Sequence, residues 1–189
     1  MALIDNYKLG IMWSVGTLSK GRDRYSLQTS DKFKVYYLKV LSEIVGAEVI
    51  EDKRMIRGKL QPLWIIRFTD GVYADKLREL GYDDPEIEYP DFIEDDFICA
   101  VLECKLKCVT VGENINNVVF RAHCKKPEQW KRLTSKYIPD KQPNLATDKT
   151  YRFSYSKSDM FNLAKTMHKL DCSNKLLWSS IISICSQFK

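Results

Sequence analysis

Apolar residues recur along the chain at helical and strand spacings, and the order of these spacings is used twice. Apolar positions three and four apart predict helices over residues 4–16, 31–46 and 71–82, and alternating positions predict strands over 24–30, 47–55 and 62–70. In the second half the same patterns predict helices over 92–103, 127–138 and 158–170, and strands over 107–112, 117–124, 143–149 and 151–157. A further apolar helix is expected over 172–188.

Boundary residues agree with these helices. Small polar side chains cap a helix by accepting from its first free N–H groups, and glycine ends one by adopting a left-handed conformation. The expected N-caps are Asp5 or Asn6, Asp31 and Ser158, and the expected stops are Gly46 and Gly81.

The two halves also align with each other. The segment YSLQTSDKFKVYYLKVL lies over VFRAHCKKPEQWKRLT, and IRFTDGVYADKLREL lies over YRFSYSKSDMFNLAKTM. Internal duplication at this scale indicates a fold built from two copies of one unit. We therefore expect an α+β protein with two pseudo-symmetric αββαββα repeats over residues 1–82 and 92–170. An acidic linker over 83–91 joins them, and a C-terminal helix over 171–189 follows.

The charge balance permits a polyanionic partner without requiring one. The net charge is +5 and the pI is about 8.8. No apolar run approaches the roughly 20 residues needed to span a bilayer. The first residues, MALIDNYKLG, lack the basic and apolar regions of a secretory signal. We expect a cytoplasmic protein with no membrane contact.

All six cysteines lie in the second half, with no Cys-x-x-Cys pair. This pattern does not resemble the dense disulfide framework of a small secreted protein, so reduced thiols are expected. Zinc binding by Cys104, Cys108, His123 and Cys124 is the alternative, although their spacing fits no standard pattern. We therefore expect no metal and no cofactor.

Between the repeats, eight of the fourteen residues from Asp83 to Asp96 are acidic. A solvated linker that enters an acidic helix is the preferred interpretation. A metal-binding or partner-binding acidic patch is the alternative.

The segment LGIMWSVGTL contains Gly10 and Gly16 followed by Thr17 and Leu18, and FICAVLECKLKCV has the small Ala100 in the place of Gly10. With the element order, these segments resemble the single-chain LAGLIDADG homing endonucleases. The resemblance implies two central helices packed together and two curved sheets that form a saddle over double-stranded DNA. It also implies that Gly10 and Ala100 face each other where the central helices cross, since a missing side chain lets backbones approach.

The catalytic acids of that family are missing. Each of its central helices ends in an acid that holds metal ions for DNA hydrolysis, and the corresponding positions are Val15 and Lys105. Valine offers no metal ligand and a lysine ammonium repels a cation. We expect no catalytic residue and no nuclease activity. Glu103, Asp95 and Asp96 are the acids from which a rebuilt site would have to be made.

Basic residues remain on the strands and hairpins that the resemblance lays along DNA. The expected contacts are Arg22, Arg24, Arg54, Arg57, Lys105, Lys107, Arg121 and Lys125. The wider basic set adds Lys20, Lys53, Lys59, Arg67, Lys141, Lys149 and Arg152.

Three functions follow, in order of preference. The first is a monomeric, catalytically inactive protein that binds double-stranded DNA as a regulator, because such domains without acids occur in bacterial transcription factors. The second is a phage or mobile-element product that binds a host protein. The third is a nuclease with a site rebuilt around Glu103.

Overall fold

The computed structural model describes residues 4–19, 22–29, 35–56, 58–92, 94–110, 118–146 and 149–186. The first repeat contains α1 (Asn6–Val15), β1 (Thr17–Leu18), β2 (Arg24–Thr29), α2 (Val35–Val45), β3 (Ile50–Ile56), β4 (Lys59–Thr69) and α3 (Gly71–Glu79). The second contains α4 (Asp95–Lys105), β5 (Lys107–Thr110), β6 (Val118–Cys124), α5 (Pro127–Thr134), β7 (Asn144–Leu145), β8 (Tyr151–Tyr155) and α6 (Lys157–Met167). The last helix is α7 (Lys175–Ser186).

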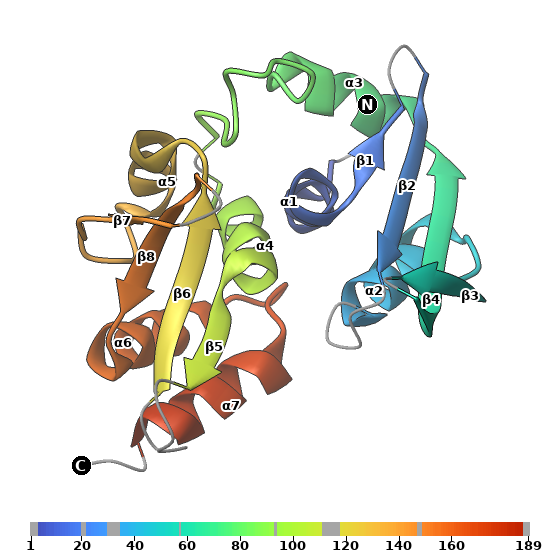
Figure 1. Ribbon diagram of the computed structural model, residues 1–189. Helices are drawn as coiled ribbons and strands as arrows, with labels where there is room; N and C mark the ends of the chain where they lie inside the picture. Colours follow the sequence, from blue (N-terminus) through green and yellow to red (C-terminus); the bar gives the residue numbers. More distant parts are fainter. Residues whose placement is uncertain are drawn as a thin grey trace.

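Each repeat forms one antiparallel four-stranded sheet, and the two sheets have the same topology. Their strand orders are β1-β2-β4-β3 and β5-β6-β8-β7. Figure 1 shows the sheets on either side of a central pair of helices, α1 and α4. The predicted fold class, α+β with two αββαββα repeats, is confirmed.

Local capping chemistry accounts for where the helices begin. Asp5 caps α1, because its Oδ1 accepts from the backbone N–H of Lys8. The predicted cap Ser158 is wrong: Ser156 caps α6 and forms a reciprocal capping box with Asp159. The pair Ser156 and Asp159 has the spacing that a capping box needs, so α6 begins two residues earlier than expected. The predicted cap Asp31 lies outside the described residues.

The helix ends agree with the sequence prediction in the first repeat and differ from it at α4 in the second. Gly46 and Gly81 both have positive φ, of 65° and 88°, as expected for residues that stop a helix. Helix α4 begins at Asp95 instead of residue 92 and continues to Lys105 instead of 103. Lys105 is therefore the last helical residue, where a cation interacts favourably with the helix dipole.

The two central helices touch through small residues. A Cβ atom at Gly10 would lie 2.6 Å from the carbonyl oxygen of Phe97 and 2.8 Å from Cβ of Ala100. Helix α1 is buried on every side from Tyr7 to Trp13, which is why its sequence shows no clear polar face. The core of the protein is therefore shared by both repeats.

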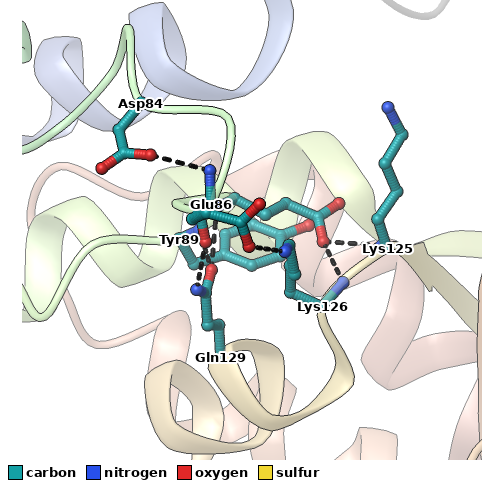
Figure 2. Close-up of polar contacts among 7 residues, drawn as sticks. Asp84, Glu86, Tyr89, Lys125, Lys126 and Gln129 are labelled. Atoms are coloured by element: carbon teal, nitrogen blue, oxygen red, sulfur yellow. Dashed lines mark hydrogen bonds and ion pairs between the residues drawn. The ribbon is translucent and has the colours of Figure 1, made fainter.

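The acidic stretch between the repeats lies against α5 (Figure 2). Glu88 Oε2 accepts from the backbone N–H groups of Lys125 and Lys126, both at 2.6 Å. Gln129 Oε1 accepts from the backbone N–H of Glu88 at 2.8 Å, and Lys126 forms an ion pair with Glu86. The carboxylate of Glu88 thus satisfies N–H groups at the start of α5. The stretch is a docked segment rather than a freely solvated linker.

Among the described helices, none has the length and apolar character to cross a membrane.

Candidate nucleic-acid interface

The first sheet has one face packed on helices and one open face. Side chains alternate between the two faces along a strand, and directly paired residues share a face. Tyr25 and Leu27 of β2 are buried in the core, and α2 packs on that side. The alternate residues define the open face of the first sheet. Its polar members are Arg24, Ser26, Gln28, Asp52, Arg54, Lys59, Gln61, Arg67 and Thr69, and Ile50, Leu63 and Ile65 add an apolar strip.

The second sheet is organised in the same way. Phe120 and Ala122 of β6 and Phe153 of β8 are buried in the core. The open face of the second sheet therefore contains the residues between them. Its members are Lys107, Val109, Val119, Arg121, His123, Asn144, Arg152 and Ser154.

Both open faces carry an excess of positive charge. The first holds Arg24, Arg54, Lys59 and Arg67 against the single acid Asp52, and the second holds Lys107, Arg121 and Arg152 with no Asp or Glu. Within the described part of the chain, none of these cations takes part in an ion pair.

The ion pairs of the described residues lie elsewhere, and most of them use cations on helices. The pairs that show this are Asp70–Lys8, Glu79–Lys76, Asp23–Arg78, Asp140–Lys131 and Asp91–Arg132. The fold therefore separates charge: helix cations are neutralised by neighbouring carboxylates, while sheet cations face solvent without them. Such a field attracts a polyanion.

On the open face of the second sheet, two cations lie directly opposite each other on neighbouring strands. Lys107 is directly opposite Arg121, an arrangement of like charges that destabilises a sheet. The Nε atoms of Arg121 and Arg152 are buried and have no hydrogen-bond partner among the described residues. Buried polar groups are ordinarily satisfied. A bound anion over these strands would relieve the repulsion between Lys107 and Arg121.

The structure places most of the expected contact residues near these faces. Arg24 and Arg54 are exposed on the first sheet, and Lys107 and the half-buried Arg121 are on the second. Lys125 is exposed just beyond the end of β6, and Figure 2 shows its side chain pointing away from Glu86 and Gln129.

The other expected contacts differ in their setting. Arg22 is exposed in the bend before β2, where its carbonyl accepts from Arg78. Lys105 is half-buried at the end of α4. Arg57 and Lys20 lie outside the described residues.

Strand register sorts the wider basic set in a way that the sequence did not. Arg67 and Arg152 belong to the open faces. Lys53 alternates with Arg54 and so projects to the opposite face, and Lys141 pairs with Asp159 at 3.1 Å. The amides of Gln28 and Gln61 and the ring of His123 also line the open faces, and their alternation with core residues was the signal that could have found them.

At the ends of the central helices, the structure holds an aliphatic side chain and a cation where the resemblance implies acids. Val15 ends α1 and Lys105 ends α4. Gly16 follows α1 because a Cβ there would lie 1.7 Å from the hydroxyl oxygen of Tyr25. That hydroxyl donates to the carbonyl of Met12 at 2.7 Å, which fixes the strand against the helix end.

Glu103, the acid considered for a rebuilt nuclease site, is buried in the core. Its side chain accepts from Tyr7 Oη at 2.5 Å, Trp178 Nε1 at 2.5 Å, the backbone N–H of Asn174 at 2.8 Å and Cys99 Sγ at 3.4 Å. Burial raises the pKa of this carboxyl, although the hydrogen bonds oppose that shift. With its lone pairs taken by donors from α1, α4 and the start of α7, Glu103 holds the fold together rather than facing a substrate.

Asp95 and Asp96, the other acids considered for a rebuilt nuclease site, also interact with other side chains. Asp95 pairs with Lys136 at 2.6 Å, which helps to hold the pKa of Asp95 below its usual range. Asp96 accepts from Cys172 Sγ at 3.0 Å. Both lie at the start of α4, at the opposite end from Lys105. The rebuilt site is therefore not assembled.

The zinc alternative also fails in the structure. His123 and Cys124 are neighbours on β6, so their side chains project to opposite faces. Within the described ranges, no three His, Cys, Asp or Glu side chains are grouped so that they could hold a metal ion.

Comparison with known proteins identifies the fold. No protein-family model matches the chain, and no curated protein matches its sequence. Among solved structures, the meganuclease I-SmaMI bound to its uncleaved DNA target in the presence of calcium ions is similar over 98% of this chain and 92% of that chain, with a TM-score of 0.56 and 10% identity.

Full-length DUF199/WhiA from Thermotoga maritima is similar over all of this chain, with a TM-score of 0.55 and 10% identity. The chain spans 63% of that protein's length. The N-terminal LAGLIDADG domain of DUF199/WhiA gives a TM-score of 0.52 and 9% identity over 94% of this chain and 88% of that chain. The chain has a LAGLIDADG-like fold, as the sequence predicted.

Proposed function

We propose that this protein binds double-stranded DNA across the open faces of its two sheets, without cleaving it, and acts as a regulator. One observation carries the proposal: among the described residues the cations of the open faces have no ion-pair partner, while other cations, on helices, supply most of the ion pairs. Unpaired cations arrayed on strands attract the phosphates of a duplex, and counterion release would drive binding.

Similarity to proteins that contact DNA supports this proposal. I-SmaMI has the same fold and was solved bound to its DNA target. The open face of the first sheet offers groups that read bases, because arginine can bind guanine and glutamine can bind adenine through two hydrogen bonds. Arg24, Arg67, Gln28 and Gln61 supply such groups on neighbouring strands. The open face of the second sheet, which holds Lys107, Arg121 and Arg152 and no acid, is suited to phosphates.

The absence of cleavage follows from the helix ends. Two-metal hydrolysis needs carboxylates that hold hard cations, and Val15 and Lys105 provide none. Incubation with Mg²⁺ or Mn²⁺ and a library of duplex targets should leave both strands intact. Metal-dependent strand breaks by the purified protein would overturn this part of the proposal.

We further propose that the protein acts as a monomer in the cytoplasm. One chain supplies both repeats, so both halves of a DNA saddle are present without a second copy.

A salt titration tests DNA binding directly. Binding of a fluorescent duplex should weaken steeply with salt, with a log–log slope near −0.9 for each phosphate neutralised. Arg67→Gln with Arg121→Gln removes one cation from each open face and should flatten the slope by about 1 per lost phosphate contact. Lys165→Gln with Lys169→Gln is the matched control, because it removes the same charge from exposed positions on and after α6.

The control separates a specific interface from net charge. If both double variants weaken binding equally, the open faces are not the interface. If the unaltered protein binds no duplex at low salt, the DNA proposal fails. A protein that docks onto a host protein would then be the leading interpretation.

A further inference from the structure

Two cysteine thiols lie together where the segment before α7 crosses the central helix α4. Cys99 is on α4 and is fully buried, whereas Cys172 precedes α7 and is half-buried. The two are 73 residues apart in the sequence and come from different elements. The contact is unrelated to the open faces of the sheets.

Three hydrogen bonds fix the course of this segment along α4. Cys172 Sγ donates to Asp96 Oδ1 at 3.0 Å, and the backbone N–H of Asn174 donates to Glu103 Oε1 at 2.8 Å. Cys99 Sγ donates to the same Glu103 oxygen at 3.4 Å. Asp96, Cys99 and Glu103 are three and four residues apart, so they share one face of the helix. The segment 172–174 therefore passes over Cys99, which places the thiol of Cys172 beside that of Cys99.

We propose that Cys99 and Cys172 are a modification site that forms a reversible disulfide bond under oxidation by a peroxide. In this position, rotation of the half-buried Cys172 side chain away from Asp96 would bring its sulfur towards that of Cys99, to form a disulfide bond of about 2 Å. The expected reductant is a small cellular thiol, which reverses the bond by exchange.

The two cysteines have different roles in the reaction because only Cys172 is accessible to a peroxide. Cys172, the accessible sulfur, attacks a peroxide oxygen, so the O–O bond breaks and a sulfenic acid and one water form. The sulfur of Cys99 then attacks the sulfenic sulfur, forming the S–S bond and releasing the hydroxyl as a second water. Each thiol proton ends in one of these waters, and the neighbouring carboxylates of Asp96 and Glu103 accept the protons in passing.

Other cysteines are less suited to this reaction. Cys104 and Cys124 are buried, and Cys108 is exposed on β5. Cys185 is half-buried in α7 and forms no hydrogen bond within the described chain. Cys185 is therefore the control residue, because it lies on the same C-terminal segment without a thiol partner in contact.

Oxidation should produce three measurable changes. Treatment with hydrogen peroxide should lower the mass by two hydrogen atoms and remove two titratable thiols. Peptide mapping without reductant should recover the Cys99 and Cys172 peptides linked. The thermal midpoint of the oxidised form should rise by roughly 5–15 °C, since the bond closes a long loop of the unfolded chain. Dithiothreitol should reverse all three.

Two serine variants test whether Cys172, and not Cys185, forms the disulfide bond. Cys172→Ser should abolish all three changes, whereas Cys185→Ser should leave them intact. Cys172→Ser is half-exposed and should fold, which its thermal midpoint in the reduced state will show. A linked peptide joining Cys108 and Cys185, or irreversible over-oxidation of Cys172 with Cys99 still free, would overturn the proposal. Loss of DNA binding in an unoxidised variant would bear on the proposed function and not on this inference.

Discussion

Replacing Gly10 with alanine tests whether the closeness of the two central helices is a requirement of the fold. The added Cβ would lie 2.6 Å from the carbonyl oxygen of Phe97 and 2.8 Å from Cβ of Ala100. Ordinary contacts of this kind lie beyond 3.4 Å, so α1 and α4 must separate by several tenths of an ångström. The neighbours are a backbone atom and a methyl group within a fully buried core, and neither can rotate away.

Two opposing terms set the expected magnitude. Alanine in a helix interior is favoured over glycine by about 1 kcal/mol. Overpacking a close helix contact costs about 1–3 kcal/mol, and the buried surroundings of Gly10 favour the upper part of that range. We therefore expect Gly10→Ala to lower the free energy of unfolding by about 1–2 kcal/mol, and Gly10→Leu to lower it further.

The assay is urea unfolding followed by circular dichroism, with Gly71→Ala as the matched control. Gly71 is also helical, but a Cβ there would be 3.5 Å from its nearest neighbour, Asp23 Oδ2, which is ordinary contact. Gly71→Ala should be neutral or stabilise by about 0.5–1 kcal/mol. Adding Ala100→Gly to Gly10→Ala should restore part of the loss. If Gly10→Ala is as stable as the unaltered protein, the helices are not held at contact distance by Gly10 and the reasoning is refuted.

Two buried charges give further predictions. Because burial raises the pKa of Glu103, the protein should gain stability as pH falls from the raised pKa towards the unfolded value near 4.3. Glu103→Gln keeps the acceptor for Trp178 and should remove that pH dependence in unfolding curves at pH 5 and 8; an unchanged dependence would assign it to another group. Lys8 is buried and pairs with Asp70 at 3.1 Å. Asp70→Asn should therefore cost about 3–5 kcal/mol in urea unfolding, less with Lys8→Met added, and a cost below about 1 kcal/mol would contradict a buried charge pair.

The sequence predicted the fold well because the signals for it are local. Helical and strand spacings mark most elements, and the repeated order of those elements indicates two copies of one unit. The small residues Gly10 and Ala100 occupy matching places in the two copies. Errors arose where two local signals competed, as when Ser156 rather than Ser158 capped α6 because Asp159 completes its capping box.

The candidate site was predicted only in part. The sequence supplied the basic residues, but alternation alone does not say which face of a strand the helices cover. Register placed Arg67 and Arg152 on the open faces and Lys53 on the other face. The acidic stretch was interpreted as solvated because nothing in its composition reveals that Glu88 reaches the start of α5.

What the sequence determined by itself was the order of the elements, the duplication and the presence of Val15 and Lys105 near the ends of the two central helices, since each can be read from residues close together in the chain. Only the tertiary structure decided what each polar side chain meets. Glu103 is held by Tyr7, 96 residues away, and by Trp178, 75 residues away. Hydrogen bonds and charge interactions act over a few ångströms in space, and folding alone brings such distant residues within that range.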